Sequence, residues 1–158
     1  MTCVMKTFVL IDPKVDLEVN KAGSFMFKMP PTHPQYDLPK RMLSCIQVLQ
    51  DDVEVFNGRV TGCKIDFYNR KQFTCEGQLA YLNDSIQRPA EYHDMTVRGY
   101  LEALIAEHNK QVTKDRQFKV GIVTVTDNND SLYRYTNYNS TMKEVKEDWL
   151  MILVVICV

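Results

Sequence analysis

The sequence predicts an α+β fold in which a small β-barrel-like domain is followed by an α+β domain. Two patterns along the 158 residues support this prediction. In the first half, short stretches alternate apolar and polar residues and are separated by turn residues, which is typical of half-buried strands. In the second half, apolar residues recur every three or four positions, which is typical of helices. The predicted domains cover 1–76 and 77–147, and 148–158 form an atypical apolar tail.

Strands are expected throughout the first domain. Asp12 and Pro13 should end the first strand, and the prolines in 30–34 should leave the sheet, because proline has no N–H to donate to a neighbouring strand. The turn at 21–24 joins two alternating stretches into a hairpin. Turns this frequent predict a small barrel or a strongly bent sheet. The predicted strands cover 6–11, 15–19, 25–29, 45–48, 53–60, 65–68 and 72–75.

Helices begin in the second domain. Apolar residues at helical spacing predict a helix over 79–86, which Pro89 ends. A longer helix is expected over 97–112, with Thr96 as its N-cap. The predicted buried stripe of this helix consists of Leu101, Leu104, Ile105, His108 and Val112.

The end of the second domain should return to strands and then to a last helix. An apolar run predicts a strand over 118–125, the Asp- and Asn-rich segment 127–130 a turn, and 132–135 the returning strand. Thr141 and Glu144 have the spacing of a capping box, so a final helix should start there.

Composition excludes several classes of protein. The net charge is −1, from 19 Lys and Arg against 20 Asp and Glu, so the sequence lacks the basic surface of a nucleic-acid-binding protein. The apolar run 150–158 is about half the length of a membrane span, and no membrane-spanning segment is expected. Five cysteines in irregular spacing predict free thiols in a reducing cytosol rather than disulfides or a zinc site.

No arrangement of residues predicts catalysis, a cofactor or a metal. His33, His93 and His108 lack the spacing of metal ligands. Segment 127–130 lacks the glycine and the glutamate of a calcium loop, so a hairpin tip explains it at least as well, and calcium stays an alternative. Cys75 and His108 would make a nucleophile–base pair on paper, but no third residue would orient them. We therefore expect a protein that is not an enzyme.

Tyrosines gather near the end of the second domain. Tyr133, Tyr135 and Tyr138 alternate with Arg134, Asn137 and Asn139. Such a patch would stack on nucleic-acid bases in a strongly basic protein, which this is not. A tyrosine-rich surface for protein–protein contacts is the better interpretation.

Seven stretches, in this order and spacing, resemble the tail-tip protein family of phages and prophages, the tail-associated minor structural proteins that often carry a lysin. The resemblance extends over about residues 7–147. The stretches are LEVN (17–20), GSFMF (23–27), PPTHPQY (30–36), VFNGRV (55–60), CEGQLAYLNDS (75–85), LIAEHN (104–109) and YRYTNYNSTMKE (133–144).

The resemblance implies a structural role in a virion. Members of this family look like the central hubs at the base of phage tails, in which a β-barrel domain precedes an α+β domain and three copies form a ring under the tail tube. The implied partners are the tail tube, the distal tail protein and two further copies in a homotrimer. The implied location is the virion tail tip, after synthesis in the bacterial cytoplasm. No catalytic residue is carried over from the family.

The tail 148–158 departs from the family, whose members continue with a polar segment and a long extension. Our hypothesis is that the gene is frameshifted or cut, and the alternative is a native strand that docks into the sheet. The expected function is thus a fragment of a tail-tip or baseplate hub that acts in assembly and host attachment. Two alternatives stay open: the N-terminal part of a tail-associated cell-wall peptidase whose catalytic domain is missing, and a receptor- or carbohydrate-binding module.

Overall fold

The computed structural model describes residues 9–19, 21–125, 129–147 and 155–157. Its contacts divide the chain into two units. Unit 1 comprises Met1–Glu18 with Ala22–Gly77, and unit 2 comprises Val19–Lys21 with Gln78–Val158. The chain mixes helices and strands, which confirms the α+β class predicted from the sequence.

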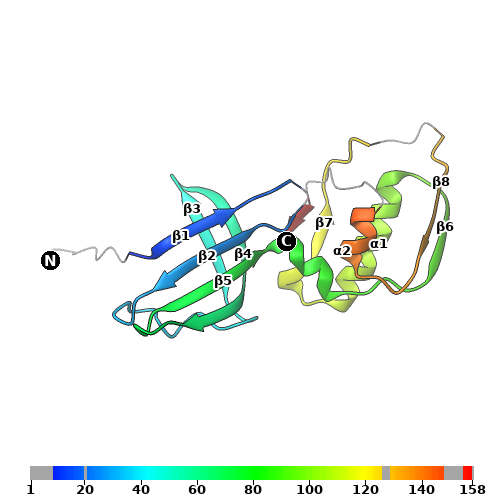
Figure 1. The fold of residues 1–158 in the computed structure, drawn as a ribbon. Helices are drawn as coiled ribbons and strands as arrows, with labels where there is room; N and C mark the ends of the chain where they lie inside the picture. The colour runs from blue at the N-terminus through cyan, green and yellow to red at the C-terminus, as the bar shows by residue number, and fades with distance from the viewer. Residues whose placement is uncertain (1–8, 20, 126–128, 148–154, 158) are drawn as a thin grey trace. The chain divides into compact units, whose positions relative to one another are not determined.

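Unit 1 is one antiparallel sheet of five strands in the order β1-β2-β5-β4-β3. The sheet curls into a half-barrel (Figure 1). Within the described part of the chain β1 and β3 pair on one side only, so both are edge strands and the barrel stays open. The strands are β1 (Ile11–Asp16), β2 (Ser24–Met29), β3 (Cys45–Gln50), β4 (Val53–Ile65) and β5 (Lys71–Gly77).

The first strand differs from its prediction. β1 runs through Asp12 and Pro13 instead of ending there, with a register irregularity between Ile11 and Lys14 and a positive φ of 48° at Asp12. An edge strand tolerates proline at such a bulge because no neighbour needs its N–H. The hairpin of β1 with β2 is confirmed, but Leu17 lies outside the sheet, 64% exposed.

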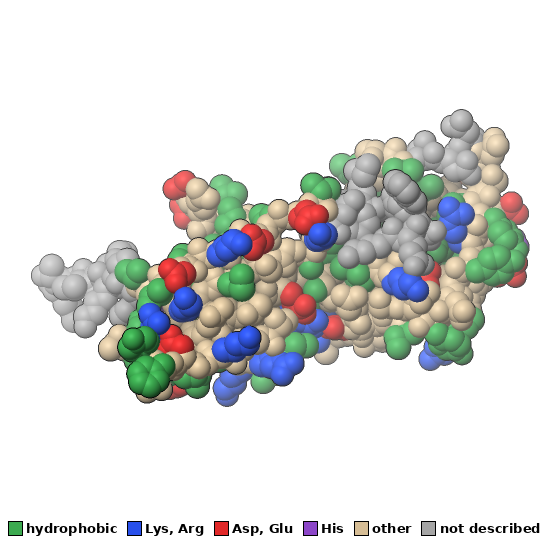
Figure 2. Space-filling view, in the orientation of Figure 1, with side chains coloured by type: hydrophobic (Ala, Val, Ile, Leu, Met, Phe, Trp, Pro, Cys, Tyr) green, Lys and Arg blue, Asp and Glu red, His purple; other side chains and the backbone are tan. Residues whose placement is uncertain are grey.

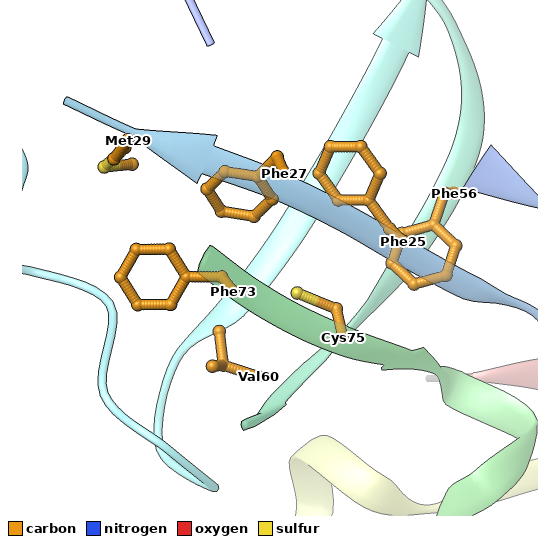
Figure 3. Close-up of a cluster of buried hydrophobic side chains, with 7 residues drawn as sticks. All are labelled: Phe25, Phe27, Met29, Phe56, Val60, Phe73 and Cys75. Atoms are coloured by element: carbon orange, nitrogen blue, oxygen red, sulfur yellow. The ribbon is translucent and has the colours of Figure 1, made fainter. Parts of the chain in front are cut away.

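The core of unit 1 is built from alternate residues of neighbouring strands. Figure 3 shows the core side chains, which come from β2, β4 and β5. Because Phe27 pairs with Phe73 and Phe25 with Cys75, side chains of the same parity in β2 and β5 face one core. The Phe27 and Phe73 ring centroids are 5.2 Å apart. The core residues are Phe25, Phe27, Met29, Phe56, Val60, Phe73 and Cys75.

Glycine allows the backbones of β4 and β5 to approach each other closely at one point. Gly58 pairs with Gly77 of β5, and a Cβ atom added at Gly58 would lie 2.0 Å from the Glu76 carbonyl oxygen. Asn57 and Gly58 lie within the 13-residue strand β4, which extends the strand predicted over 53–60.

Unit 2 is organised around the helix α1 (Val97–Gln111). Its predicted N-cap is confirmed, since the Thr96 hydroxyl accepts a hydrogen bond from the Gly99 N–H at 2.9 Å. Four residues of the predicted stripe are buried, while Val112 is the C-cap and only partly buried. The other elements are η1 (Gln78–Asp84), β6 (Ala90–Met95), η2 (Lys114–Arg116), β7 (Phe118–Val120), β8 (Leu132–Thr136), α2 (Thr141–Glu147) and β9 (Val155–Cys157).

The helix predicted over 79–86 is a shorter 3₁₀ helix, η1. Ile86, expected on its buried face, is 53% exposed. The reason is that Ser85 and Gln87 on either side of it are each 1% exposed and make buried hydrogen bonds. In extended backbone, two inward neighbours turn the residue between them outward.

Strand pairing in unit 2 also differs from the prediction. The strand expected over 118–125 is limited to β7, and its partner is β9 rather than the stretch at 132–135. That stretch forms β8, which pairs with β6. β9 lies in the apolar tail, and its pairing with β7 is the kind of contact that a docked native strand requires. The frameshift origin of the tail stays a hypothesis.

The capping residue of the last helix lies one position before the predicted one. The Ser140 hydroxyl accepts from the Lys143 N–H at 3.3 Å, so Ser140 is the capping residue and Thr141 is the first helical residue. Thr141 is fully buried and its hydroxyl bonds elsewhere. Of the helices in the described ranges, none is long and apolar enough to cross a membrane.

Candidate interaction surfaces and a buried polar relay

A chain of hydrogen bonds runs through the interior of unit 2. It joins four side chains that are each at most 1% exposed, and we call it the polar relay: Ser85, Gln87, His108 and Thr141. Ser85 and Gln87 follow η1, His108 lies on the inner face of α1, and Thr141 opens α2. The relay therefore connects three helical elements.

The direction of each bond follows from its ends. The His108 Nε2 is 3.0 Å from the Arg116 carbonyl oxygen, which can only accept, so Nε2 carries the proton. The Nδ1 atom then accepts from the Ser85 hydroxyl at 2.6 Å. Ser85 in turn accepts from Thr141 at 2.7 Å, and Thr141 accepts from the Gln87 amide at 2.6 Å. Burial lowers the pKa of His108, which favours the neutral imidazole that this order requires.

A serine beside a histidine invites comparison with a nucleophile and its base. Here the Ser85 hydroxyl is enclosed by protein and its oxygen already accepts from Thr141, so no substrate carbonyl has access to it. The relay instead satisfies polar groups that would be costly to bury alone. The role of the relay is therefore to stabilise the interior of unit 2.

The cysteine and the histidine considered as a pair from the sequence are each buried within their own unit. Cys75 lies in the aromatic core of unit 1, where burial raises the pKa of its thiol to about 11, and His108 belongs to the polar relay of unit 2. The His33 Nδ1 accepts from the Gln35 N–H at 3.1 Å in the loop after β2. Over the described ranges, no three His, Cys, Asp or Glu side chains group as metal ligands would. The segment 127–130 lies partly outside those ranges.

The β6–β8 ribbon presents a polar aromatic face. Because Glu91 pairs with Tyr135, the residues two positions away on each strand point to the same side. All four side chains of this side are exposed, whereas Tyr92 on the other side packs its ring against Tyr100 of α1. We call this exposed set the tyrosine face: Glu91, His93, Tyr133 and Tyr135.

The members of the tyrosine face are bound to one another. Tyr133, Tyr135 and His93 all contact the same Glu91 oxygen, Oε1, with Tyr135 at 3.0 Å and His93 at 2.9 Å. These contacts, the bond from Tyr133 first, lower the pKa of Glu91, and the same bond raises the pKa of Tyr133. The face is thus a carboxylate surrounded by aromatic rings and held before any ligand arrives.

The sequence identified only part of this face. Tyr133 and Tyr135 were expected in a contact surface, while Tyr138 is exposed but takes no part in the cluster, and Arg134 pairs opposite Tyr92 on the other side of the ribbon. Glu91 and His93 were missed because β6 was not predicted. Their only sequence signal is that polar residues flank Tyr92 on both sides, and an alternation of three residues is too short to identify a strand.

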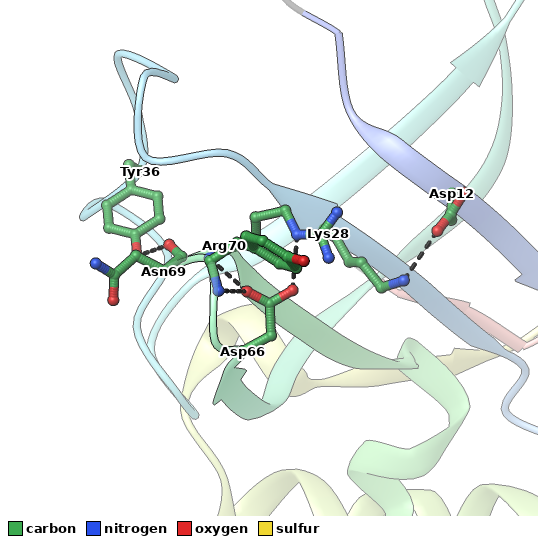
Figure 4. A network of polar contacts seen from close by, with 7 residues as sticks. Asp12, Lys28, Tyr36, Asp66, Asn69 and Arg70 are labelled. Atoms are coloured by element: carbon green, nitrogen blue, oxygen red, sulfur yellow. Dashed lines mark hydrogen bonds and ion pairs between the residues drawn. The ribbon is translucent and has the colours of Figure 1, made fainter.

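Unit 1 carries a second exposed aromatic site at the turn between β4 and β5. We call residues 66–70 the hairpin tip. The Asp66 carboxylate accepts from the backbone N–H groups of Tyr68 and Arg70, each at 2.9 Å, and from the Arg70 Nε at 2.7 Å (Figure 4). These bonds lower the pKa of Asp66 against its partial desolvation, so the tip is held by a charged carboxylate.

This hydrogen-bonded turn displays two aromatic rings. Phe67 is 94% exposed and Tyr68 is 69% exposed, with their ring centroids 5.5 Å apart in an edge-to-face arrangement. The Arg70 guanidinium lies 5.0 Å from the centre of the Tyr68 ring. Hydrophobic side chains gather at the end of unit 1 that carries this turn and over the β6–β8 ribbon (Figure 2). An ordered loop that exposes a phenylalanine is a typical interaction anchor.

No family model and no curated protein matches the sequence.

Proposed function

We propose that this chain is a structural subunit, or a fragment of one, of a phage or prophage tail-tip hub, which acts in tail assembly and host attachment through protein–protein contacts. The hairpin tip carries the proposal. Phe67 and Tyr68 are exposed side by side on a turn that Asp66 holds in place, so a partner can bury both rings at little cost in entropy. The resemblance of the sequence to tail-tip proteins supplies the biological setting.

The half-barrel supplies a geometric mechanism. Among the described residues each edge strand pairs on one side only, so neighbouring copies could continue the sheet around a ring. In a homotrimer this ring would face the tail tube and the distal tail protein. The site of action would be the virion tail tip, after synthesis in the bacterial cytoplasm.

The proposal is tested by measuring assembly. We expect light scattering after size-exclusion chromatography to show a trimer, or co-elution with the distal tail protein of the same phage, and negative-stain images to show rings. Replacing Phe67 and Tyr68 by serine should weaken either contact at least tenfold. Ile122→Ser, which removes another apolar side chain that is 76% exposed, is the matched control and should leave assembly unchanged. A protein that stays monomeric at high concentration and does not bind the distal tail protein would refute the proposal.

A further inference from the structure

We propose that the tyrosine face of unit 2 is a binding site for an organic cation, an alkylammonium group carried by a small molecule or by a lysine side chain. The inference is independent of the hub assignment, because it depends only on the chemistry of the β6–β8 ribbon.

The charge at the centre of the face is only partly used. Glu91 directs one oxygen, Oε1, at Tyr133, Tyr135 and His93, and among the described residues its other oxygen, Oε2, has no hydrogen-bond partner. Hydrogen bonds from the tyrosines favour the charged form of the carboxylate. An exposed anion whose position is fixed by its neighbours attracts a cation without having to be reordered.

Aromatic rings stand beside this carboxylate, so a cation that binds to it would also contact aromatic surface. The Tyr133 ring is inclined by 85° to the Tyr135 ring and by 65° to the His93 ring, with centroid distances of 5.0 Å and 4.3 Å. The Tyr135 residue is 61% exposed, so much of its ring surface is open to a ligand. Exposed aromatic rings attract ammonium groups, and the charge of Glu91 adds to this attraction.

Other ligands fit the same residues less well. A divalent metal needs several oxygen ligands, and the face offers one carboxylate with one available oxygen. A neutral sugar would use the rings but not the charge. The phenol groups, which would otherwise bind sugar hydroxyls, already donate to Glu91 or contact each other. Charge and ring arrangement together therefore favour a cation.

The backbone conformation of β6 also supports a cation-binding site. The pairing of β6 with β8 is irregular between Tyr92 and Met95, and Asp94 has a positive φ of 50°. A bulge at this point strengthens the local twist of the ribbon and re-aims the side chain beside it, here His93. The exposed Asp94 also adds negative charge beside the face.

The test is a titration of the isotope-labelled full chain followed by NMR. We expect saturable shifts confined to the β6–β8 ribbon with choline, and at least about fivefold weaker binding of 3,3-dimethyl-1-butanol, its uncharged carbon isostere, as cation–π and charge attraction are lost. A second arm titrates Nα-acetyl-lysine methylamide. Tighter binding of choline would indicate a small quaternary ammonium ligand, and tighter binding of the lysine derivative would indicate a protein partner.

Variants separate the site from the fold. Glu91→Gln should weaken choline binding at least tenfold and Tyr135→Ala at least fivefold, with unchanged dispersion of the remaining NMR signals. Tyr138→Ala is the matched control, since Tyr138 is 71% exposed and outside the face, and it should bind as the wild type does. Equal affinity for choline and its uncharged isostere, shifts located elsewhere, or full binding by Glu91→Gln would each overturn the proposal. So would a neutral disaccharide that binds this face more tightly than either cation.

Discussion

Replacing Ser85 by alanine should destabilise unit 2 far more than the loss of one hydroxyl from a surface would. The hydroxyl donates to the His108 Nδ1 at 2.6 Å and accepts from Thr141 at 2.7 Å, and all three side chains are buried. Removing it leaves one acceptor and one donor without partners, and each such group costs about 1–3 kcal/mol. The Thr141 oxygen keeps its bond from Gln87, and alanine leaves almost no cavity. The expected loss is therefore about 2–4 kcal/mol, toward the lower end of that sum.

The measurement is the free energy of unfolding from urea titrations followed by circular dichroism, combined with hydrogen exchange resolved to peptides. Exchange should accelerate in η1, α1 and α2, which the polar relay connects, and remain unchanged in β1–β5. Thr124→Ala, an exposed hydroxyl of the same unit, is the matched control and should change stability by less than about 0.5 kcal/mol. A loss in Ser85→Ala as small as that of the control would show that the relay contributes nothing, and would refute the reasoning.

Three further predictions concern pH, a glycine and a cap. The pKa of His108 is lowered in the folded protein, so the unfolded chain takes up the proton first as the pH falls below about 6.5. Below that pH the wild type should lose stability relative to His108→Gln, with a slope approaching about 1.4 kcal/mol per pH unit. Parallel pH profiles of the two proteins would contradict this. Gly58→Ala should cost about 2–3 kcal/mol in urea titrations, because its Cβ would lie 2.0 Å from the Glu76 oxygen, whereas Gly62→Ala, whose Cβ would meet Thr74 at 3.7 Å, should cost much less. Thr96→Ala should lower the thermal stability of unit 2 by about 1 kcal/mol through loss of the N-cap bond, and an unchanged midpoint would argue against that role.

Local periodicity predicted the strands and helices whose burial is decided by their own side chains. The alternation of Phe25, Phe27 and Met29 identified β2 because one face of that strand is buried throughout. The spacing of Leu101, Leu104 and Ile105 identified α1 for the same reason. Such patterns arise because one face of the element is buried, so they predict the element without knowledge of what covers that face.

Pairing partners could not be predicted in this way. β7 and β9 are separated by more than thirty residues, and β6 and β8 by a similar distance, and nothing local distinguishes these pairs from the hairpin expected between 118–125 and 132–135. The tyrosine face was only partly predicted for the same reason. Its tyrosines were visible from composition, but Glu91 and His93 join them only through the register of two distant strands. The capping residue of α2 was misplaced because the Thr141 hydroxyl is used by a network that the sequence does not reveal.

The span of the polar relay has a consequence for the order of folding during synthesis. Unit 1 completes its sheet when β5 has left the ribosome, so its core can close while the rest of the chain is still being made. Unit 2 cannot do the same, because the hydroxyl of Thr141 must reach Ser85, 56 positions earlier in the chain, before the interior of α1 is satisfied. Until then the Ser85 oxygen lacks the bond from Thr141, and the Gln87 amide lacks Thr141 as an acceptor. We therefore expect nascent chains that end before α2 to hold a folded first unit and a protease-sensitive second one.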